Sequence, residues 1–284
     1  CNMAVYPFNP ENTTCLICGS SNLHRFVANA GDYDKGDDRT VNITECADCI
    51  FAWQYPYPEE PIDDVKYFEW AMNTQGNYFN RQKKRPICEL KFNFISELPR
   101  SGNTLLDLGA GNGVFAEIAA ENGWEVTAVD PALNVDLLSG HPNLNPIRGT
   151  IDIIPKKKSF DIVILWDVIE HTANPIKFIL KVKDYLIDGG LIIIETGNYK
   201  SADRVSGCRN SWIYQQQHRW YFSPESMQQL LTDLGFSEFR FSDRVLNPKW
   251  KGTAQYPGPS LIHYIKRAIK DPLSILRYAS TYLK

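Results

Sequence analysis

The feature that most constrains the fold is a glycine-rich turn directly after a short apolar run. Residues 105–113 read Leu-Leu-Asp-Leu-Gly-Ala-Gly-Asn-Gly, and a helical pattern begins at once. Glycines let the main chain turn sharply and come close to a ligand, while the first N–H groups of the helix point toward it. The order strand, glycine turn, helix predicts a nucleotide-binding crevice, although a plain strand-to-helix junction can carry the same glycines.

The middle of the chain alternates between short apolar runs and helical patterns. The expected strands are Thr104–Leu108, Glu125–Val129, Phe160–Trp166 and Gly190–Glu195, with a last pair around 236–246. The expected helices cover 63–98, 113–122, 175–187 and 224–234. Alternating strands and helices are typical of a parallel sheet covered by helices. We therefore expect an α/β fold.

Four of the seven cysteines form two closely spaced pairs, 27 residues apart: Cys15 with Cys18, and Cys46 with Cys49. A gap of two residues turns both thiolates of a pair toward one point, and two such pairs complete a tetrahedral zinc site. Four thiolates close the coordination sphere, so we expect a structural zinc ion. The remaining cysteines have no spaced partner and are expected to be incidental thiols: Cys1, Cys88 and Cys208.

Two aspartates indicate the ligand of the glycine turn. Asp130 ends the second expected strand, where a carboxylate can accept both hydroxyls of a ribose. Asp107 lies two residues before the first glycine, and the glycine spacing is Gly-x-Gly-x-Gly. A carboxylate there suits the ammonium group of a methionine moiety better than the pyrophosphate of a dinucleotide. The pattern favours S-adenosylmethionine (SAM) over NAD.

These motifs resemble those of the class I SAM-dependent methyltransferases over roughly residues 75–245. The matching segments are LLDLGAGNG, EVTAVDPA, RGTIDIIP, FDIVILWDVIEHTANP and LIDGGLIIIETGN. The resemblance implies a Rossmann-like sheet of seven strands and a set of cofactor-binding residues. In that set, the methionine end of SAM is lined by Asp107, Gly109, Ala110, Gly111 and Gly113. The ribose is bound by Asp130, the adenine is flanked by Thr150 or Ile151, and the methyl-donor side is faced by Trp166 and Asp167.

A second resemblance concerns residues 218–223, which read His-Arg-Trp-Tyr-Phe-Ser. Together with the cysteine pairs, this segment is similar to sugar methyltransferases that act on nucleotide-linked deoxysugars, where the matching histidine is the catalytic base. The resemblance implies that His218 is the base and that Tyr221 helps to position it. A packing or capping role for His218 is the alternative.

The same resemblance leaves the acceptor atom open. Gln217 stands where that family tends to have an acid, and the chain ends where its C-methyltransferases continue into another domain. We therefore expect O-methylation of a sugar, in a nucleotide sugar or a glycan. The alternative is a C-methyltransferase of a nucleotide-linked keto-deoxysugar.

Asp167, Glu170 and His171 form a further constellation. Some quinone O-methyltransferases hold a divalent ion with a similar acid-x-x-Glu-His run, and such an ion could lower the pKa of an acceptor hydroxyl. In other class I methyltransferases Glu-His followed by Asn-Pro shapes the loop under the cofactor. Both interpretations stay open for this chain.

Charge divides the chain into an acidic body and a basic tail. The net charge is −3, yet residues 245–284 carry seven positive side chains and one acid. Between Cys15 and Cys49 lie six acids against three lysines and arginines, which would repel a phosphate backbone. This argues against the alternative of an RNA methyltransferase with a zinc ribbon. A SAM-binding scaffold without activity is the third class considered.

We expect three parts: a zinc-binding module at 1–60, the methyltransferase domain at 61–246 and a basic helical C-terminal extension at 247–284. The apolar positions from Leu261 to Lys284 suit an amphipathic helix that packs on the body or a second subunit, or that contacts an anionic membrane. No apolar run approaches the roughly 20 residues of a membrane span, and no export signal is recognised. The predicted location is cytoplasmic and the predicted partner is a small-molecule or saccharide acceptor.

Overall fold

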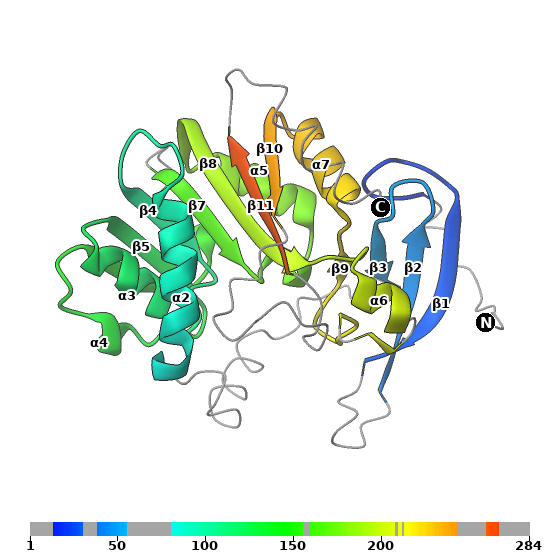
Figure 1. The fold of residues 1–284 in the computed structure, drawn as a ribbon, viewed down its shortest axis with the longest axis horizontal. Coiled ribbons are helices and arrows are strands. Elements are labelled where there is room, and N and C mark those ends of the chain that lie inside the picture. Colours follow the sequence, from blue (N-terminus) through cyan, green and yellow to red (C-terminus); the bar gives the residue numbers. More distant parts are fainter. Residues whose placement is uncertain are drawn as a thin grey trace.

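The computed structural model describes residues 14–30, 39–55, 81–155, 160–207, 210–211, 213–242 and 260–266. These residues form one sheet of four strands and one of seven (Figure 1). The strands of the larger sheet are β4 Thr104–Leu108, β5 Glu125–Asp130, β6 Leu144–Arg148, β7 Phe160–Trp166, β8 Leu186–Gly197, β10 Glu238–Ser242 and β11 Ser260–Lys266. Their order across the sheet is β10-β11-β8-β7-β4-β5-β6.

The larger sheet is parallel from β6 to β8 and reverses its strand order at β4. Strands β5 and β6 lie on one side of β4, and β7 and β8 lie on the other. Strand β11 pairs antiparallel with both β8 and β10. In open α/β sheets, ligands bind beyond the carboxyl ends of the strands where the order reverses. The topology therefore places a ligand crevice at the end of β4, where the glycine turn begins.

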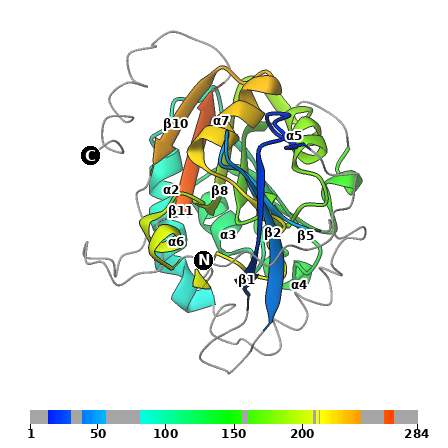
Figure 2. The same cartoon turned by 90° about the vertical axis from the view of Figure 1, so that its right-hand side faces the viewer.

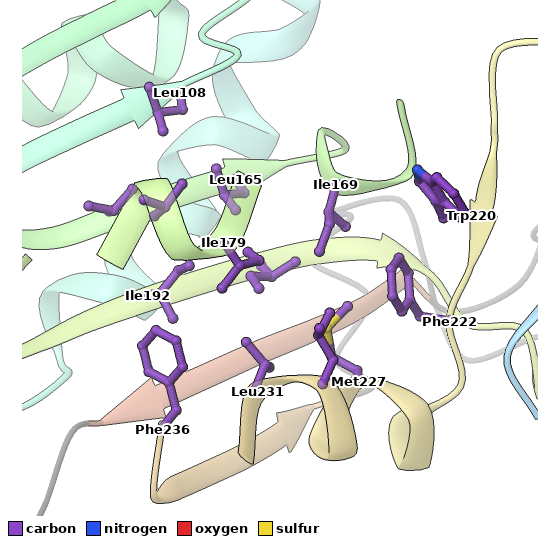
Figure 3. Close-up of a cluster of buried hydrophobic side chains, with 14 of the residues drawn as sticks. Leu108, Leu165, Ile169, Ile179, Ile192, Trp220, Phe222, Met227, Leu231 and Phe236 are labelled. Carbon is purple, nitrogen blue, oxygen red and sulfur yellow. The ribbon is translucent and has the colours of Figure 1, made fainter. Parts of the chain in front are cut away.

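The helices cover both faces of this sheet. They are α2 Arg81–Ser96, α3 Val114–Glu121, α4 Val135–Leu138, α5 Pro175–Lys183, α6 Ala202–Gly207 and α7 Pro224–Asp233, with short 3₁₀ turns at Ile151–Ile153 and Ile169–His171. Alternate residues of β7 face opposite sides, so Ile162 and Ile164 pack with α2 and α3 while Val163 and Leu165 pack with α5 and α7. Figure 3 shows the second of these packed layers. The predicted Rossmann-like α/β fold is confirmed.

The smaller sheet joins the N-terminal segment to the body of the protein. It consists of β1 Leu23–Asn29, β2 Thr40–Cys46, β3 Ala52–Gln54 and β9 Trp220–Tyr221, all antiparallel and in the order β1-β2-β3-β9. Figure 2 views the protein from the side of this sheet. Strand β9 lies just before α7, so the sheet spans residues that are far apart in the sequence.

Aromatic packing holds the smaller sheet against the larger one. The ring of Phe51 stacks on Trp53 and Trp220, with centroids 5.6 Å and 6.1 Å away, and contacts Phe222 at 5.1 Å. All four side chains belong to the buried cluster that includes α7 and the centre of the large sheet. The N-terminal segment is therefore packed into a continuous core.

The predicted C-terminal helix is wrong for residues 261–266. These residues are part of β11, which fills the position between β8 and β10. Their apolar spacing suits a helix as well as a strand, and the unpaired main-chain groups at the edges of β8 and β10 decide for the strand. Residues 267–284 lie outside the described part of the chain.

Other element boundaries also differ from expectation. Only one strand, β10, lies within 236–242, and its partner is β11. The sequence does not predict strand β6, because Asn145 and Pro146 interrupt its apolar pattern. Helix α2, Arg81–Ser96, lies within the expected helix 63–98; residues 63–80 lie outside the described residues, as do Cys1 and Cys208, so the predictions for them stay untested. Within the described ranges, no helix is long and apolar enough to cross a bilayer.

Candidate functional site

The glycine turn after β4 has the main-chain conformation that its sequence requires. Gly109, Gly111 and Gly113 have φ of 78°, 56° and 73°, in the left-handed region that favours glycine. A Cβ on Gly109 would lie 2.4 Å from Cγ2 of Val168, whereas a Cβ on Gly111 would meet no atom within 4 Å. Gly109 is thus required for packing, while a Cβ on Gly111 would enter open space, where a ligand could approach the turn.

Asp107 is a buried carboxylate that still needs a cation. It is 1% exposed, and neither carboxylate oxygen has a hydrogen-bond partner among the residues that the structure describes. Burial, with a contribution from the charge of Asp130, raises the pKa of Asp107 to about 7. The ammonium group of SAM would supply the missing partner, so this orphaned carboxylate fits the predicted cofactor.

Asp130 joins the glycine turn to the loop after β5. One carboxylate oxygen accepts a hydrogen bond from Gly111 N at 3.0 Å, and the other accepts one from Ala132 N at 2.7 Å. Each carboxylate oxygen can accept a second hydrogen bond, so this arrangement is compatible with binding ribose hydroxyls. Asp130 therefore holds the turn and the loop together at the position where the sequence predicts the ribose.

The two residues expected at the adenine lie near Asp130 but differ in their environment. Gly149 N donates to the main-chain oxygen of Asp130 at 3.0 Å, which brings Thr150 beside the loop. The side chain of Thr150 caps the following 3₁₀ turn by accepting from Asp152 N. Ile151 is buried, and its main-chain oxygen accepts from the Tyr185 hydroxyl at 3.1 Å. Thr150 is the better placed of the two to contact a ligand.

Trp166 and Asp167 follow the end of β7, beside a buried ion pair that the sequence did not indicate. Lys91 Nζ lies 2.6 Å from Glu195 Oε2 and 4.5 Å from the ring centroid of Trp166. The ring of Trp166 also makes an edge-to-face contact with the ring of Phe115, with centroids 5.5 Å apart. Asp167 has φ of 53°, and burial together with Glu195 raises its pKa to about 6. These contacts hold Trp166 in a defined orientation at the predicted methyl-donor side.

His218 has the tautomer that a general base needs. Its Nδ1 lies 2.9 Å from the main-chain oxygen of Ile213, so Nδ1 carries the proton and donates it. Nε2 then carries the lone pair. Burial lowers the pKa of His218 to about 4, so the ring is neutral at pH 7.

Tyr221 acts on the main chain of His218 rather than on its imidazole. The Tyr221 hydroxyl donates to the main-chain oxygen of His218 at 2.8 Å. Tyr221 itself is buried in β9. The Tyr221 hydroxyl therefore contacts the peptide group of His218 and not its imidazole, and a positioning role for Tyr221 stays a prediction.

Glu170, His171 and His218 form a cluster whose ligand atoms all lie within 4.8 Å of one another. Asp167, which the sequence grouped with Glu170 and His171, is not in this cluster. Oε2 of Glu170 is buried and unpaired among the described side chains, and burial raises the pKa of Glu170 well above its usual value. Two imidazoles and a carboxylate could hold a divalent ion, so His218 rather than Asp167 would complete such a site.

The four cysteines come together as predicted. Sγ of Cys15 lies 3.5 Å from that of Cys49, Sγ of Cys18 lies 3.5 Å from that of Cys46, and all four lie within 4.8 Å of one another. A tetrahedral zinc ion with bonds of about 2.3 Å would hold its sulfur ligands ~3.8 Å apart. The cluster therefore has the dimensions of a zinc site.

Both cysteine pairs use the same turn. Gly19 N donates to the Cys15 oxygen at 2.9 Å, and Ile50 N donates to the Cys46 oxygen at 3.0 Å. The residue after each second cysteine has a positive φ, 73° at Gly19 and 55° at Ile50. The backbone thus presents the two sulfur pairs in equivalent ways, which is the arrangement that a four-thiolate site requires.

A family model described as a methyltransferase domain matches residues 79–237. The chain belongs to this family. Together with the sheet order, the match confirms the predicted class I SAM-dependent methyltransferase domain, and the matched range begins after the cysteine pairs. Asp107, Asp130 and His218 all lie inside it.

Relatives and solved structures agree with this membership. The ubiquinone biosynthesis O-methyltransferase of Rickettsia canadensis is 29% identical over 157 residues, which cover 51% of this chain and 64% of that protein. The protein of that name from Rickettsia prowazekii is 29% identical over 214 residues, 68% of this chain and 83% of its own. The 1,6-didemethyltoxoflavin-N1-methyltransferase of Burkholderia thailandensis, solved with S-adenosylhomocysteine, has a TM-score of 0.51 at 15% identity and covers 78% of this chain and 98% of its own. This last likeness concerns the fold.

Sequence reasoning missed Lys91, Glu195 and Gln54, which all contact predicted site residues. Lys91 could have been found, because it lies on the helix face of Cys88, Phe92 and Ile95, where a charge must have a partner. Gln54 carries no comparable signal, since its partners are main-chain oxygens more than 160 residues away.

Proposed function

We propose that the chain transfers a methyl group from SAM to a hydroxyl oxygen of a small molecule, with His218 as the general base. The observation that carries the proposal is the hydrogen bond from His218 Nδ1 to Ile213 O at 2.9 Å, which leaves the lone pair of the imidazole on Nε2. The names of the relatives, which are O-methyltransferases, support oxygen as the acceptor atom.

The residues around the glycine turn would hold the cofactor. Bound SAM supplies an electrophilic methyl group. Asp107 binds its ammonium group, the carboxylate of Asp130 accepts from the ribose hydroxyls, and Gly111 lets the turn approach the ligand. Trp166, which contacts both Lys91 and Phe115, limits the space on the donor side. Alignment of donor and acceptor is the main contribution that a protein makes to such a displacement.

His218 removes the acceptor proton. A pKa of about 4 makes the imidazole a weak base toward a free hydroxyl. When the acceptor oxygen bonds to the methyl carbon, the bond from that carbon to the SAM sulfur would break and S-adenosylhomocysteine would leave. The hydroxyl proton becomes strongly acidic as this bond forms and passes to Nε2 of His218. A weak base of the correct tautomer suffices at that stage, because the proton leaves while the new bond forms.

The acceptor class has two candidates. A sugar hydroxyl, in a nucleotide sugar or glycan, is favoured by the resemblance of residues 218–223 and by the cysteine module that packs against them. An intermediate of ubiquinone biosynthesis is favoured by the names of the relatives. The names of these relatives give no support to C-methylation of a keto-deoxysugar or to methylation of RNA.

An acceptor screen tests this proposal. The protein is incubated with SAM and either nucleotide sugars or hydroxylated intermediates of ubiquinone biosynthesis, and the products are analysed by mass spectrometry and ¹³C NMR. We expect one added methyl group with the chemical shift of a methoxy carbon. A methyl group bonded to carbon or nitrogen would contradict the proposal.

A further inference from the structure

The segment that carries His218 depends on the N-terminal module for its conformation. Residues 215–219 form no helix, and the two-residue strand β9 that follows them is completed by β3. Ala52 pairs with Tyr221 and Trp53 with Trp220. The module and the proposed catalytic loop are therefore parts of one sheet.

Gln54 makes the central contact between them. Its side-chain Nε2 donates toward three main-chain oxygens, at 2.8 Å to Gln215, 3.1 Å to Gln216 and 2.5 Å to His218. Its main-chain N donates to Arg219 O at 2.9 Å. One glutamine thus binds the peptide groups on both sides of the His218 side chain.

The oxygen of His218 receives two donors. In addition to Gln54 Nε2, the Tyr221 hydroxyl donates to it at 2.8 Å. The imidazole is oriented independently, by the bond from Nδ1 to Ile213 O. A shift of the main chain at His218 would therefore move Nε2 or break the bond that fixes the tautomer.

The cysteine turn stabilises the same segment from the module side. The turn Cys46–Cys49 joins β2 to β3, and Cys46 N donates to Phe51 O at 2.8 Å. Ser223, which caps α7 after the loop, donates from its hydroxyl to Cys49 O at 3.0 Å. The cysteine turn is thus bonded to the loop through β3 and through Ser223.

We propose that Gln54 is a positioning residue for His218, and that the four-cysteine cluster maintains this arrangement without contacting the substrate. The inference rests on the proposed role of His218 as base. This inference gives a reason why a small N-terminal module accompanies the methyltransferase domain. Strand β3, the last strand of the module, supplies hydrogen bonds that the loop of His218 does not make within itself.

The test replaces Gln54 by methionine, which keeps the size of the side chain and removes both donors. Gln229→Met serves as the matched control, because Gln229 is exposed on α7, where its side chain donates a hydrogen bond to Asp233. The measurements are kcat, KM, the Kd for SAM and the ¹H–¹⁵N resonances of the His218 imidazole as a function of pH. The NMR readout reports the position of the ring and does not require turnover.

We expect Gln54→Met to lower kcat by about 10-fold to 100-fold, the loss produced when a reacting group moves by ~1 Å. The Kd for SAM should stay within about 2-fold, and the Nδ1–H signal of His218 should broaden or shift as its bond to Ile213 weakens. If Gln54→Met is poorly folded, Gln54→Asn provides a shorter donor, with an intermediate effect expected on both readouts.

Wild-type kcat together with an unchanged His218 spectrum in Gln54→Met would overturn the inference. Full activity of His218→Asn would be a separate result, because it removes the base assignment on which the inference rests. Chelation of the metal from the intact protein supplies a further readout. We expect the His218 resonances to move in the same direction as in Gln54→Met, and unchanged resonances in metal-depleted protein would contradict the role of the cluster.

Discussion

The imidazole rings of His171 and His218 meet edge to face, with centroids 4.9 Å apart and planes at 74°. Each ring donates its Nδ1 proton to a main-chain oxygen, His171 to Gln217 at 3.1 Å and His218 to Ile213 at 2.9 Å. Both Nε2 atoms therefore carry lone pairs, although only His218 belongs to the segment that the sequence marks as catalytic. Two neutral histidines in contact can serve as base and neighbour, or as two ligands of one ion together with Glu170.

Substitution of each histidine distinguishes these roles. His218→Asn should lower kcat by roughly 10²-fold to 10⁴-fold, the usual contribution of a general base, while the Kd for SAM stays unchanged. His171→Asn should reduce kcat much less, because it removes the neighbouring ring and its bond to Gln217 O but leaves the bond from His218 Nδ1 to Ile213 O in place. The exposed His24→Asn serves as control. An equal decrease of kcat in both variants, accompanied by loss of a bound metal ion, would indicate that His171 and His218 are two metal ligands and that His218 is not a base.

The two buried histidines should also make stability depend on pH. Burial lowers the pKa of His218 to about 4 and, with the neighbouring His218, that of His171 to about 3. An unfolded histidine titrates near 6.5, so below about pH 6.5 the unfolded state binds more protons and the free energy of unfolding falls. Each histidine should remove roughly 2 kcal/mol by pH 5 relative to pH 8.

Urea unfolding of wild type and His171→Gln at pH 8, 6 and 5 measures this effect. The carboxyl groups of Asp107 and Asp167 have raised pKa values and act in the opposite direction, since they bind protons more readily in the folded state. The informative quantity is therefore the difference in the free energy of unfolding between variant and wild type. We expect the variant to gain stability relative to wild type as the pH falls. If this difference were the same at all three pH values, the buried neutral state of His171 would be refuted.

Cofactor affinity should depend on the ionisation of Asp107. Its pKa of about 7 means that the carboxylate is half protonated near neutral pH, while the cofactor's ammonium group requires the charged form. The affinity for SAM should therefore increase from pH 6 to pH 7.5. Asp107→Asn should bind SAM more weakly at pH 7.5 and show little change over this range. Calorimetric titration at both pH values provides the measurement, and a variant with the wild-type pH dependence would exclude Asp107 as its source.

Asp130 should contribute to cofactor affinity in two ways. Asp130→Ala removes the acceptors of Gly111 N and Ala132 N as well as the predicted ribose ligand. Losing buried acceptors costs on the order of 1–3 kcal/mol each, so the thermal midpoint should fall together with a large increase in the Kd for SAM. Asp130→Asn retains one acceptor oxygen and should be intermediate. An unchanged Kd in Asp130→Ala would remove this residue from the ribose site.

Metal analysis tests the four-cysteine cluster. We expect one zinc ion per chain, lost in Cys46→Ser, together with a lower thermal midpoint, because the cluster lies beside the core that Phe51 and Trp53 share with the large sheet. Cys88→Ser is the matched control, since Cys88 lies on α2 outside the cluster. Wild-type zinc content in Cys46→Ser would contradict the assignment, and a second metal equivalent that disappears in His171→Asn would instead locate an ion at the histidines.

Local patterns predicted the elements that surround the cofactor crevice. The strands β4 and β7 have the predicted boundaries, and the glycines after β4 have the conformations that their spacing indicated. These features depend on residues close together in the sequence: apolar runs that form buried strands, and glycines in turns that other residues adopt only with strain. The cysteine pairs belong to the same class, because a two-residue gap sets the geometry of each turn.

Tertiary structure decided the features that join distant segments. Residues 261–266 fit a helix or a strand by their spacing, and the open edges of β8 and β10 selected the strand. Lys91 and Glu195 form a buried ion pair from elements about 100 residues apart. Gln54 donates to main-chain oxygens, which every residue possesses, so no side-chain pattern identifies its partners. The sequence by itself therefore determined the fold family and the chemistry of single residues. Only the folded chain decided which of these residues are in contact, because burial and pairing between distant segments depend on the whole sheet.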